Sequence, residues 1–351
     1  MPIVICFDTE TTGMPPPSTN PKFKTEGFFN DKRVPAELWP RIVQLSFIQY
    51  DTDKEAIVQH YDQIIKMKPG VKIPKASTDV HGITDQISKT KGIDIRRAMM
   101  DFMKAYYDSE VTIGHNVQFD LNVVCAELTI LIRDPSTSPQ DKKSFEYLAT
   151  SLMGKKRPKF CTMRESKTVC KLPSFKYDSE TDQPMTDSRG YYVIDDALDE
   201  RGDHKFRGSN LENTHKILFQ EKPNGQLHNA LVDVAVCLRV YMKLYKNVDI
   251  CDASHRPTNN FVYNLIKPTR ILSNELPARV GDDPKTFEMR RMNDFKFNKK
   301  FKTGEELDRP ESKSIPRVSR SKTRSYRRRN TKSASPLKRK SNKTRRERNS
   351  Y

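Results

Sequence analysis

The order of the apolar segments along the chain is the feature that most constrains its fold. Residues 3–7 form a compact run of strand-forming side chains, and two longer apolar stretches follow at 42–50 and 57–67. The polar turn 51–54 joins these two stretches directly, which indicates neighbouring antiparallel strands. Residues 111–114 form a further short strand. We therefore expect a sheet that begins as an antiparallel meander.

Helical periodicity dominates between and after these strands. Apolar residues recur at three- and four-residue steps over 95–106, a pattern typical of an amphipathic helix. Further helices are expected over about 119–132, 140–153 and 229–246. Strands followed by alternating helices and a strand predict an α/β fold with a central mixed β-sheet flanked by helices.

Positive charge is concentrated at one end of the chain. The 351 residues carry 63 Lys and Arg against 45 Asp and Glu, a formal net charge of +18. Residues 309–351 alone hold 17 Lys and Arg against two Glu, so the remainder is close to neutral. This basic tail has almost nothing to bury and is expected to be disordered. Residues 177–203 have the opposite character, with nine acidic and two basic side chains.

These patterns predict a chain of three parts. Residues 1–246 are expected to form one domain, with insertions at about 14–40 and 177–203. Residues 247–308 contain apolar side chains interrupted by prolines, which indicates a partly ordered extension or linker. The disordered basic tail follows at 309–351.

Several classes of protein are excluded by composition. No apolar run approaches the ~18–20 residues that a membrane span requires. The first residues are uncharged and lead directly into acidic side chains, unlike a secretory signal peptide. The six cysteines show no CxxC spacing, which favours unpaired thiols and an intracellular, reducing location.

Acidic side chains occur at three places where a fold would not otherwise favour them. Asp8 and Glu10 follow the first apolar run two residues apart, so strand periodicity directs both to one face of the sheet. Asp120 lies where a strand meets a helix, although alone it could serve as a helix N-cap. Asp233 lies within an apolar helix, where an unpaired carboxylate is costly. Neighbouring carboxylates repel unless a proton or cation lies between them.

The types of these residues favour a particular metal. Four carboxylates without a cysteine or histidine cluster form a set of hard oxygen ligands, which suits Mg²⁺ or Mn²⁺ rather than Zn²⁺. Two such cations about 3.5–4 Å apart can hold a phosphodiester and activate water. His228 would supply a neutral base for that water, although a lone histidine is more often a surface or capping residue.

Three sequence motifs carry these residues: Phe-Asp-Thr-Glu-Thr-Thr-Gly at 7–13, Gly-His-Asn-x-x-Phe-Asp at 114–120 and His-Asn-Ala-Leu-Val-Asp at 228–233. They resemble the three exonuclease motifs of the DEDDh 3′–5′ exonucleases. That group lies within the ribonuclease H-like superfamily and includes the DNA polymerase III epsilon subunit and RNase T. His-Gly-Ile-Thr at 81–84 is similar to a short motif that many members carry. The resemblance covers roughly 1–246 and implies a ribonuclease H-like exonuclease fold.

The resemblance also implies roles for individual residues. It implies ligands for two Mg²⁺ or Mn²⁺ ions and a general base, which fall on Asp8, Glu10, Asp120, Asp233 and His228. It implies contacts with the 3′ end of a substrate, which fall on Thr11, Thr12, His81, Ile83, Asn116 and Phe119. Structural alternatives remain for three of these residues. Thr11 and Thr12 could simply shape a turn, and His81 could cap a helix or pack in the core.

The activity implied is that of a metal-dependent 3′–5′ exonuclease, which releases nucleoside 5′-monophosphates from single-stranded or frayed 3′ ends of DNA. Two alternatives stay open. One is an exoribonuclease, because contacts that read the 2′-hydroxyl cannot be located in the sequence. The other is a non-catalytic nucleic-acid-binding module with the same fold.

The partner expected is therefore DNA, with RNA as the alternative. The basic tail is expected to bind nucleic acid non-specifically with a steep salt dependence, or to act as a nuclear localisation signal. A role in DNA repair or proofreading, and a location in the nucleus or a viral replication compartment, are further expectations from this composition.

Overall fold

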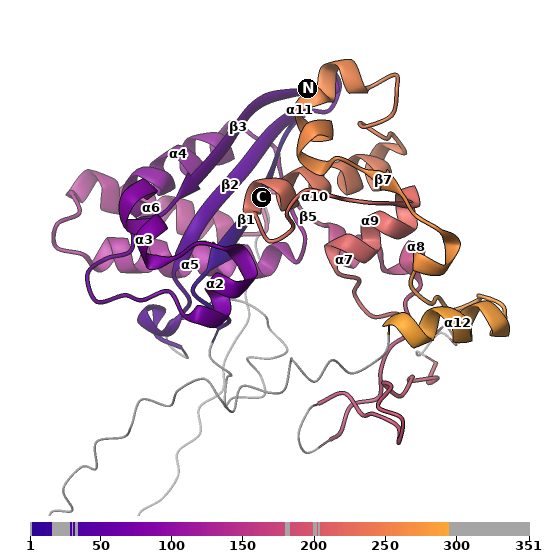
Figure 1. Ribbon diagram of the computed structural model, residues 1–351. Helices are drawn as coiled ribbons and strands as arrows, with labels where there is room; N and C mark the ends of the chain where they lie inside the picture. Colours follow the sequence, from indigo (N-terminus) through magenta and orange to yellow (C-terminus); the bar gives the residue numbers. More distant parts are fainter. Residues whose placement is uncertain are drawn as a thin grey trace, which may run out of the picture. The chain divides into compact units, whose positions relative to one another are not determined.

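Figure 1 shows the computed structural model of the protein, in which helices cover both faces of a central sheet. The structure describes residues 2–15, 29, 31, 34–179, 183–198, 202 and 204–294. The expected basic tail and much of the expected 14–40 insertion lie outside the described residues.

Five strands form the central sheet: β1 (Ile3–Thr11), β2 (Ile42–Asp51), β3 (Ala56–Ile64), β4 (Val111–Gly114) and β5 (Lys159–Cys161). Their spatial order is β3-β2-β1-β4-β5. The first three strands pair antiparallel, whereas β1 with β4 and β4 with β5 pair in parallel. The expected meander and mixed sheet are confirmed. The three-residue edge strand β5 was not foreseen, because so short a strand leaves no periodic pattern.

The four helices predicted from the sequence are confirmed to within two residues at each end: α4 (Ile95–Tyr107), α5 (Val117–Arg133), α6 (Pro139–Met153) and α10 (Ala230–Lys246). Local chemistry explains where three of them begin. Asp94, Ser138 and Asn229 each accept a hydrogen bond from a backbone N–H in the first turn of α4, α6 and α10 respectively.

Shorter elements complete the described part of the chain. The helices are α2 (Lys75–His81), α3 (Asp85–Lys91), α7 (Thr162–Glu165), α8 (Lys167–Cys170), α9 (Leu211–Phe219), α11 (Arg256–Ile266) and α12 (Pro284–Asp294). Two 3₁₀ turns occupy η1 (Ala36–Leu38) and η2 (Ser273–Glu275). A separate two-stranded ribbon joins β6 (Glu221–Lys222) and β7 (Thr269–Arg270).

The central strand β1 separates two hydrophobic cores. Ile5 and Phe7 pack with side chains of α4 and α5 on one face. Val4 and Cys6 pack with side chains of α10 on the other. Figure 1 shows α4 and α6 to the left of the strands and α9 and α10 to the right. Because side chains alternate along a strand, residues 8 and 10 face the α10 side.

The acidic segment 177–203 is an arm with few regular elements. Its described residues are held by isolated backbone bridges, including one between Thr186 and Tyr192. The chain reverses between them at Gly190, whose positive φ of 83° favours a residue without a Cβ. This part of the arm is a small hairpin.

The segment after residue 246 contains α11 and α12. Val262 and Ile266 of α11 are fully buried in the same core as α10. The expected domain boundary at 246 stays a prediction. All six cysteines are unpaired, as expected. No helix among the described residues is long and apolar enough to cross a membrane.

Candidate active site

An acidic cluster lies where β1 passes the first turn of α10. Asp8, Glu10 and Asp233 each offer a carboxylate oxygen, and these atoms all lie within 4.8 Å of one another. Strand periodicity places the first two on the face that α10 covers. The cap at Asn229 starts α10 so that Asp233 falls in its first turn. Two distant segments thus meet at one point, as the sequence predicted.

The donor set fits a divalent cation. Oxygens that share one Mg²⁺ at about 2.1 Å lie up to about 4.2 Å apart, so oxygens within 4.8 Å need only small side-chain rotations. All three ligands are carboxylates, the donors that Mg²⁺ and Mn²⁺ prefer. The cluster is therefore a candidate metal site.

Asp120, on α5, contacts β1 from the face of the sheet opposite to α10. Its Oδ1 accepts hydrogen bonds from the backbone N–H (3.1 Å) and hydroxyl (2.7 Å) of Thr9. The N-cap position of α5 is Asn116, so the alternative of Asp120 as an N-cap is wrong. Asp120 is almost fully buried and lies outside the group of three within 4.8 Å. Its assignment as a ligand stays a prediction.

The four carboxylates destabilise one another as anions. Burial, reinforced by Asp233 and Asp120, raises the pKa of Glu10 to about 8. Burial raises the pKa of Asp120 to about 7 against the opposing hydrogen bonds from Thr9. Burial likewise raises the pKa of Asp233 to about 7, and the pKa of Asp8 lies well above its ordinary value. A bound cation would replace the protons that such a cluster otherwise retains.

His228 lies at the rim of this cluster. Its side chain is exposed, and its backbone has a positive φ of 63°, an uncommon conformation for a residue other than glycine. In that conformation its N–H donates to Oδ2 of Asp233 at 3.1 Å. The N-cap of α10 is Asn229, so His228 does not cap this helix. The backbone of His228 thus contacts the acidic cluster, and the residue lines the cavity beside it.

A cavity of about 490 Å³ opens next to the cluster. Two carboxylates and two imidazoles line it, together with six residues from α7 and from the segment 207–211 at the start of α9: Asp8, Asp233, His228, His115, Met163, Arg207, Gly208, Ser209, Asn210 and Leu211. The acidic ligands thus border a space that is open to a substrate.

Two residues expected to contact a substrate shape the turn after β1. The Thr11 hydroxyl donates to the carbonyl of Gly13 at 2.7 Å, and the Thr12 hydroxyl accepts from the N–H of Arg41 at 2.9 Å. Both side chains therefore have a structural role, and their contact with a substrate stays a prediction.

His81 and Ile83 are both buried at the end of α2. Nδ1 of His81 accepts from the N–H of Ile83 at 3.0 Å, across Gly82 with its φ of 77°. Burial lowers the pKa of His81, and the charge of His228, which lines the cavity, lowers it further. This motif therefore borders the candidate site.

Asn116 and Phe119 begin α5 beside Asp120. Asn116 has a left-handed backbone conformation at the N-cap, and Phe119 is partly buried against the core. Their contacts with a substrate, like those of His81 and Ile83, stay predictions.

Sequence reasoning missed Gln44. This buried residue on β2 lies opposite Glu10 in the β1–β2 pair. Its Oε1 accepts from the N–H of Ala230 at 3.2 Å, and its Nε2 donates to Oδ1 of Asp62 at 2.7 Å. Ser46 donates to the same carboxylate oxygen at 2.7 Å. Gln44 thus connects the first residue of α10 to the sheet. Local sequence patterns do not predict this contact, because its partners lie far apart along the chain.

The contacts of His115 indicate a structural role. Its Nδ1 lies 2.9 Å from the hydroxyl of Thr162 and its Nε2 lies 2.8 Å from the carbonyl of Ser209. Because a carbonyl only accepts, Nε2 carries the proton. Burial lowers the pKa of His115 to about 4, so the ring is neutral and bridges two walls of the cavity.

A comparison with known protein families identifies a match for part of this chain. A family model described as exonuclease, RNase_T, matches residues 5–177, which include Asp8, Glu10 and Asp120. Residues 5–177 belong to this exonuclease family. The match ends before α10. The inclusion of His228 and Asp233 in the candidate site therefore rests on the structure alone. No curated protein matches the chain.

Several solved structures of Exonuclease I are similar in fold. The enzyme from Methylocaldum szegediense is 13% identical with a TM-score of 0.39, and the match covers 70% of this chain and 41% of that one. The E. coli enzyme in complex with a dT13 oligonucleotide is 15% identical with a TM-score of 0.40, covering 71% and 42% respectively. This chain thus spans less than half the length of either enzyme.

Proposed function

We propose that the protein is a metal-dependent 3′–5′ exonuclease that acts on single-stranded or frayed 3′ ends of DNA and releases nucleoside 5′-monophosphates. One observation carries the proposal: Asp8 and Glu10 meet Asp233 within 4.8 Å beside a cavity that His228 also lines. Membership of an exonuclease family supports the reaction class.

Each acidic residue has a role in this proposal. When bound, two Mg²⁺ or Mn²⁺ ions supply charge stabilisation to the phosphodiester and activate water. Asp8, Glu10 and Asp233 hold the tighter ion. Asp8 also reaches the second, which Asp120 supports through water.

His228 is the proposed general base. Its imidazole accepts the proton of the attacking water, and the 3′-oxygen of the shortened strand is the leaving group. The exposed position of its side chain at the cavity allows it to meet solvent and substrate together. The residues Thr11, Thr12, His81, Ile83, Asn116 and Phe119 are proposed to hold the terminal nucleotide.

The Asp8→Asn variant tests the site. It keeps the shape of the side chain but removes a ligand, so the rate of nucleotide release should fall by roughly three orders of magnitude or more. In metal-free buffer at neutral pH the variant should have a higher melting temperature than the wild type, because a buried amide, unlike Asp8 with its raised pKa, needs no proton to lie beside the other carboxylates. Release of mononucleotides from a labelled oligonucleotide and thermal unfolding measure the two effects.

Substrate choice is tested by digestion of matched DNA and RNA oligonucleotides, single- and double-stranded, with Mg²⁺ and with Mn²⁺. Faster digestion of DNA is expected. Digestion of RNA alone would transfer the proposal to an exoribonuclease. Binding of oligonucleotides without turnover by the wild type, at any metal concentration, would instead favour a nucleic-acid-binding module.

A further inference from the structure

A second cavity, of about 350 Å³, lies beside the edge strand β5. The start of α5, the end of α6, the loop 154–158, β5 and α7 all contribute to it. Its lining residues are Val117, Gln118, Met153, Gly154, Lys155, Arg157, Pro158, Lys159, Cys161 and Arg164. Four of these side chains are basic and none is acidic, so the cavity has a positive potential.

Two of the basic side chains build the cavity wall. Nη1 of Arg157 donates to the carbonyl of Tyr106 near the end of α4 at 2.7 Å. Nζ of Lys159 donates to the carbonyl of Gly154 at 2.8 Å. These bonds fix the course of the loop and hold both cations in place before any ligand binds.

The other two basic side chains extend into solvent. Lys155 is exposed, and 65% of the Arg164 side chain is exposed. Arg164 pairs with its neighbour Glu165 at 2.8 Å, but such an exposed ion pair contributes little free energy. A phosphate group can therefore replace Glu165 as the partner of the Arg164 guanidinium, with which a phosphate forms two parallel hydrogen bonds.

The cavity adjoins the candidate active site. Residues 161–164 separate the two, since Cys161 and Arg164 line this cavity whereas Met163 lines the catalytic one. On the other wall, Gln118 lies two residues before Asp120. A strand whose 3′ end reaches Asp8 and Asp233 can thus place a neighbouring phosphate in the basic cavity.

We propose that this cavity is a phosphate-binding subsite for the backbone of the cleaved strand, upstream of the nucleotide that is released. Lys155 and Arg164 contact the phosphate, while Arg157 and Lys159 are positioning residues. The inference rests on the proposed nuclease activity and adds to it a site that determines affinity for polynucleotides but takes no part in bond cleavage.

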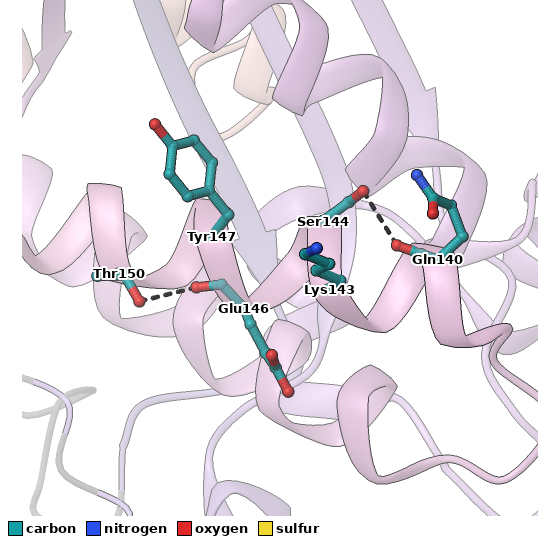
Figure 2. A pocket seen from close by; sticks show the side chains of 6 residues that line it. All are labelled: Gln140, Lys143, Ser144, Glu146, Tyr147 and Thr150. Atoms are coloured by element: carbon teal, nitrogen blue, oxygen red, sulfur yellow. Dashed lines mark hydrogen bonds between the residues drawn. The ribbon is translucent and has the colours of Figure 1, made fainter.

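Another cavity offers a contrast and a control. It measures about 510 Å³ and lies on the outer face of α6 alone. Figure 2 shows its side chains, among them Lys143 together with the acidic Glu146. The hydroxyls of Ser144 and Thr150 are bonded to carbonyls of their own helix. Its mixed charge and single-helix lining give a polyanion no comparable site.

The test compares Lys155→Ala/Arg164→Ala with the matched double variant Lys143→Ala/Lys104→Ala, which removes two exposed positive charges elsewhere. We expect the first pair to raise KM for a single-stranded DNA oligonucleotide roughly 3- to 10-fold and to reduce the salt slope of binding by about 0.7, the value for one phosphate of a single strand, with kcat unchanged. The control pair should change KM and the salt slope each by less than about twofold.

A small substrate separates this inference from the proposed function. Thymidine 5′-p-nitrophenyl phosphate has no upstream phosphate, so both double variants should hydrolyse it as the wild type does. If the wild type cleaves it and the two pairs have the same KM for the oligonucleotide, the subsite is refuted while the nuclease stands. If the wild type cleaves neither substrate with Mg²⁺ or Mn²⁺, the proposed function fails.

A third substrate, a duplex with a recessed 3′ end, shows which strand occupies the basic cavity. If the Lys155/Arg164 pair affects only a duplex with a recessed 3′ end and leaves the single strand unaffected, the cavity holds the complementary strand and the assignment to the cleaved strand is wrong. Equal effects on both substrates support the proposal. Equal melting temperatures of the variants show that the fold is intact.

Discussion

Gln44 joins three parts of the candidate site through one side chain. Its amide links Ala230 of α10 to Asp62 of β3, and its backbone lies opposite Glu10. The first N–H groups of a helix have no partner within the helix, so the bond to Ala230 fixes where α10 begins. The position of Asp233, three residues later, follows from that start. Gln44 is thus a positioning residue.

Replacement of Gln44 tests this role. Gln44→Met keeps the volume of the side chain but leaves the Ala230 N–H and the Asp62 carboxylate without this partner. We expect the Mn²⁺ concentration for half-maximal activity to rise about 10-fold or more, as for other groups that orient metal ligands. Activity at saturating Mn²⁺ should recover substantially. A metal titration of oligonucleotide cleavage measures both.

The control is Gln59→Met, an exposed glutamine on β3. It should leave the metal titration unchanged. A Gln44→Met variant with wild-type metal dependence would contradict the positioning role, and a loss of activity that no metal concentration restores would point to a role beyond positioning.

At the scale of elements, an ionic contact fastens α11 to the turn between β2 and β3. The imidazole of His255, just before α11, lies 2.8 Å from Oδ1 of Asp252 and 3.0 Å from Oε2 of Glu55. Asn259 donates to the carbonyl of Glu55 at 3.0 Å. The hydrogen bond that His255 donates to Asp252, with the charges of Asp252, Glu55 and Asp249, raises the pKa of His255 above its ordinary value of about 6.5.

This contact predicts a dependence of stability on pH. Because the pKa is raised on folding, the stabilisation is complete below about pH 6.5 and is lost as the pH rises through the pKa of the folded state. His255→Gln should therefore cost about 0.2–1 kcal/mol at pH 6, typical of exposed ion pairs, and much less at pH 9. Thermal unfolding at the two pH values measures this difference.

The exposed His204 of the acidic arm provides the control for this measurement. His204→Gln should show the same small effect at both pH values. An effect of His255→Gln that stays constant between pH 6 and pH 9 would mean that packing, not charge, fastens α11.

At the scale of the whole molecule, the charge is divided unequally. Of the net charge of +18, +15 resides in residues 309–351, outside the described part of the chain. The basic cavity beside β5 is a local exception within an otherwise balanced domain. Long-range attraction of a polyanion and local contact with its phosphates are therefore properties of different parts of the sequence.

Deletion of 309–351 tests the contribution of the tail. We expect weaker binding of oligonucleotides and a flatter dependence of affinity on salt, because fewer counterions are released on binding. The value of kcat at saturating substrate should be unchanged. Fluorescence anisotropy between about 50 and 200 mM salt measures the slope, and an unchanged slope would contradict a role of the tail in binding.

Patterns within a single element were sufficient to predict much of the fold. Strand alternation predicted that Asp8 and Glu10 share a face, and helical periodicity predicted α10 with Asp233 inside it. Short elements such as β5 and the pair α2–α3 lack enough residues for such a pattern. They form because the neighbouring strand or core stabilises them.

The sequence by itself determined the order of strands and helices, the acidic residues of the cluster and their common side of the sheet, because each depends on neighbours a few residues apart. Only the tertiary structure decided that Gln44 supports α10, that His115 bridges the cavity walls and that Lys155 and Arg164 share a cavity with Gln118. The partners in those contacts lie far apart along the chain. Such contacts form only when the packed cores bring the segments together, and local periodicity carries no signal of them.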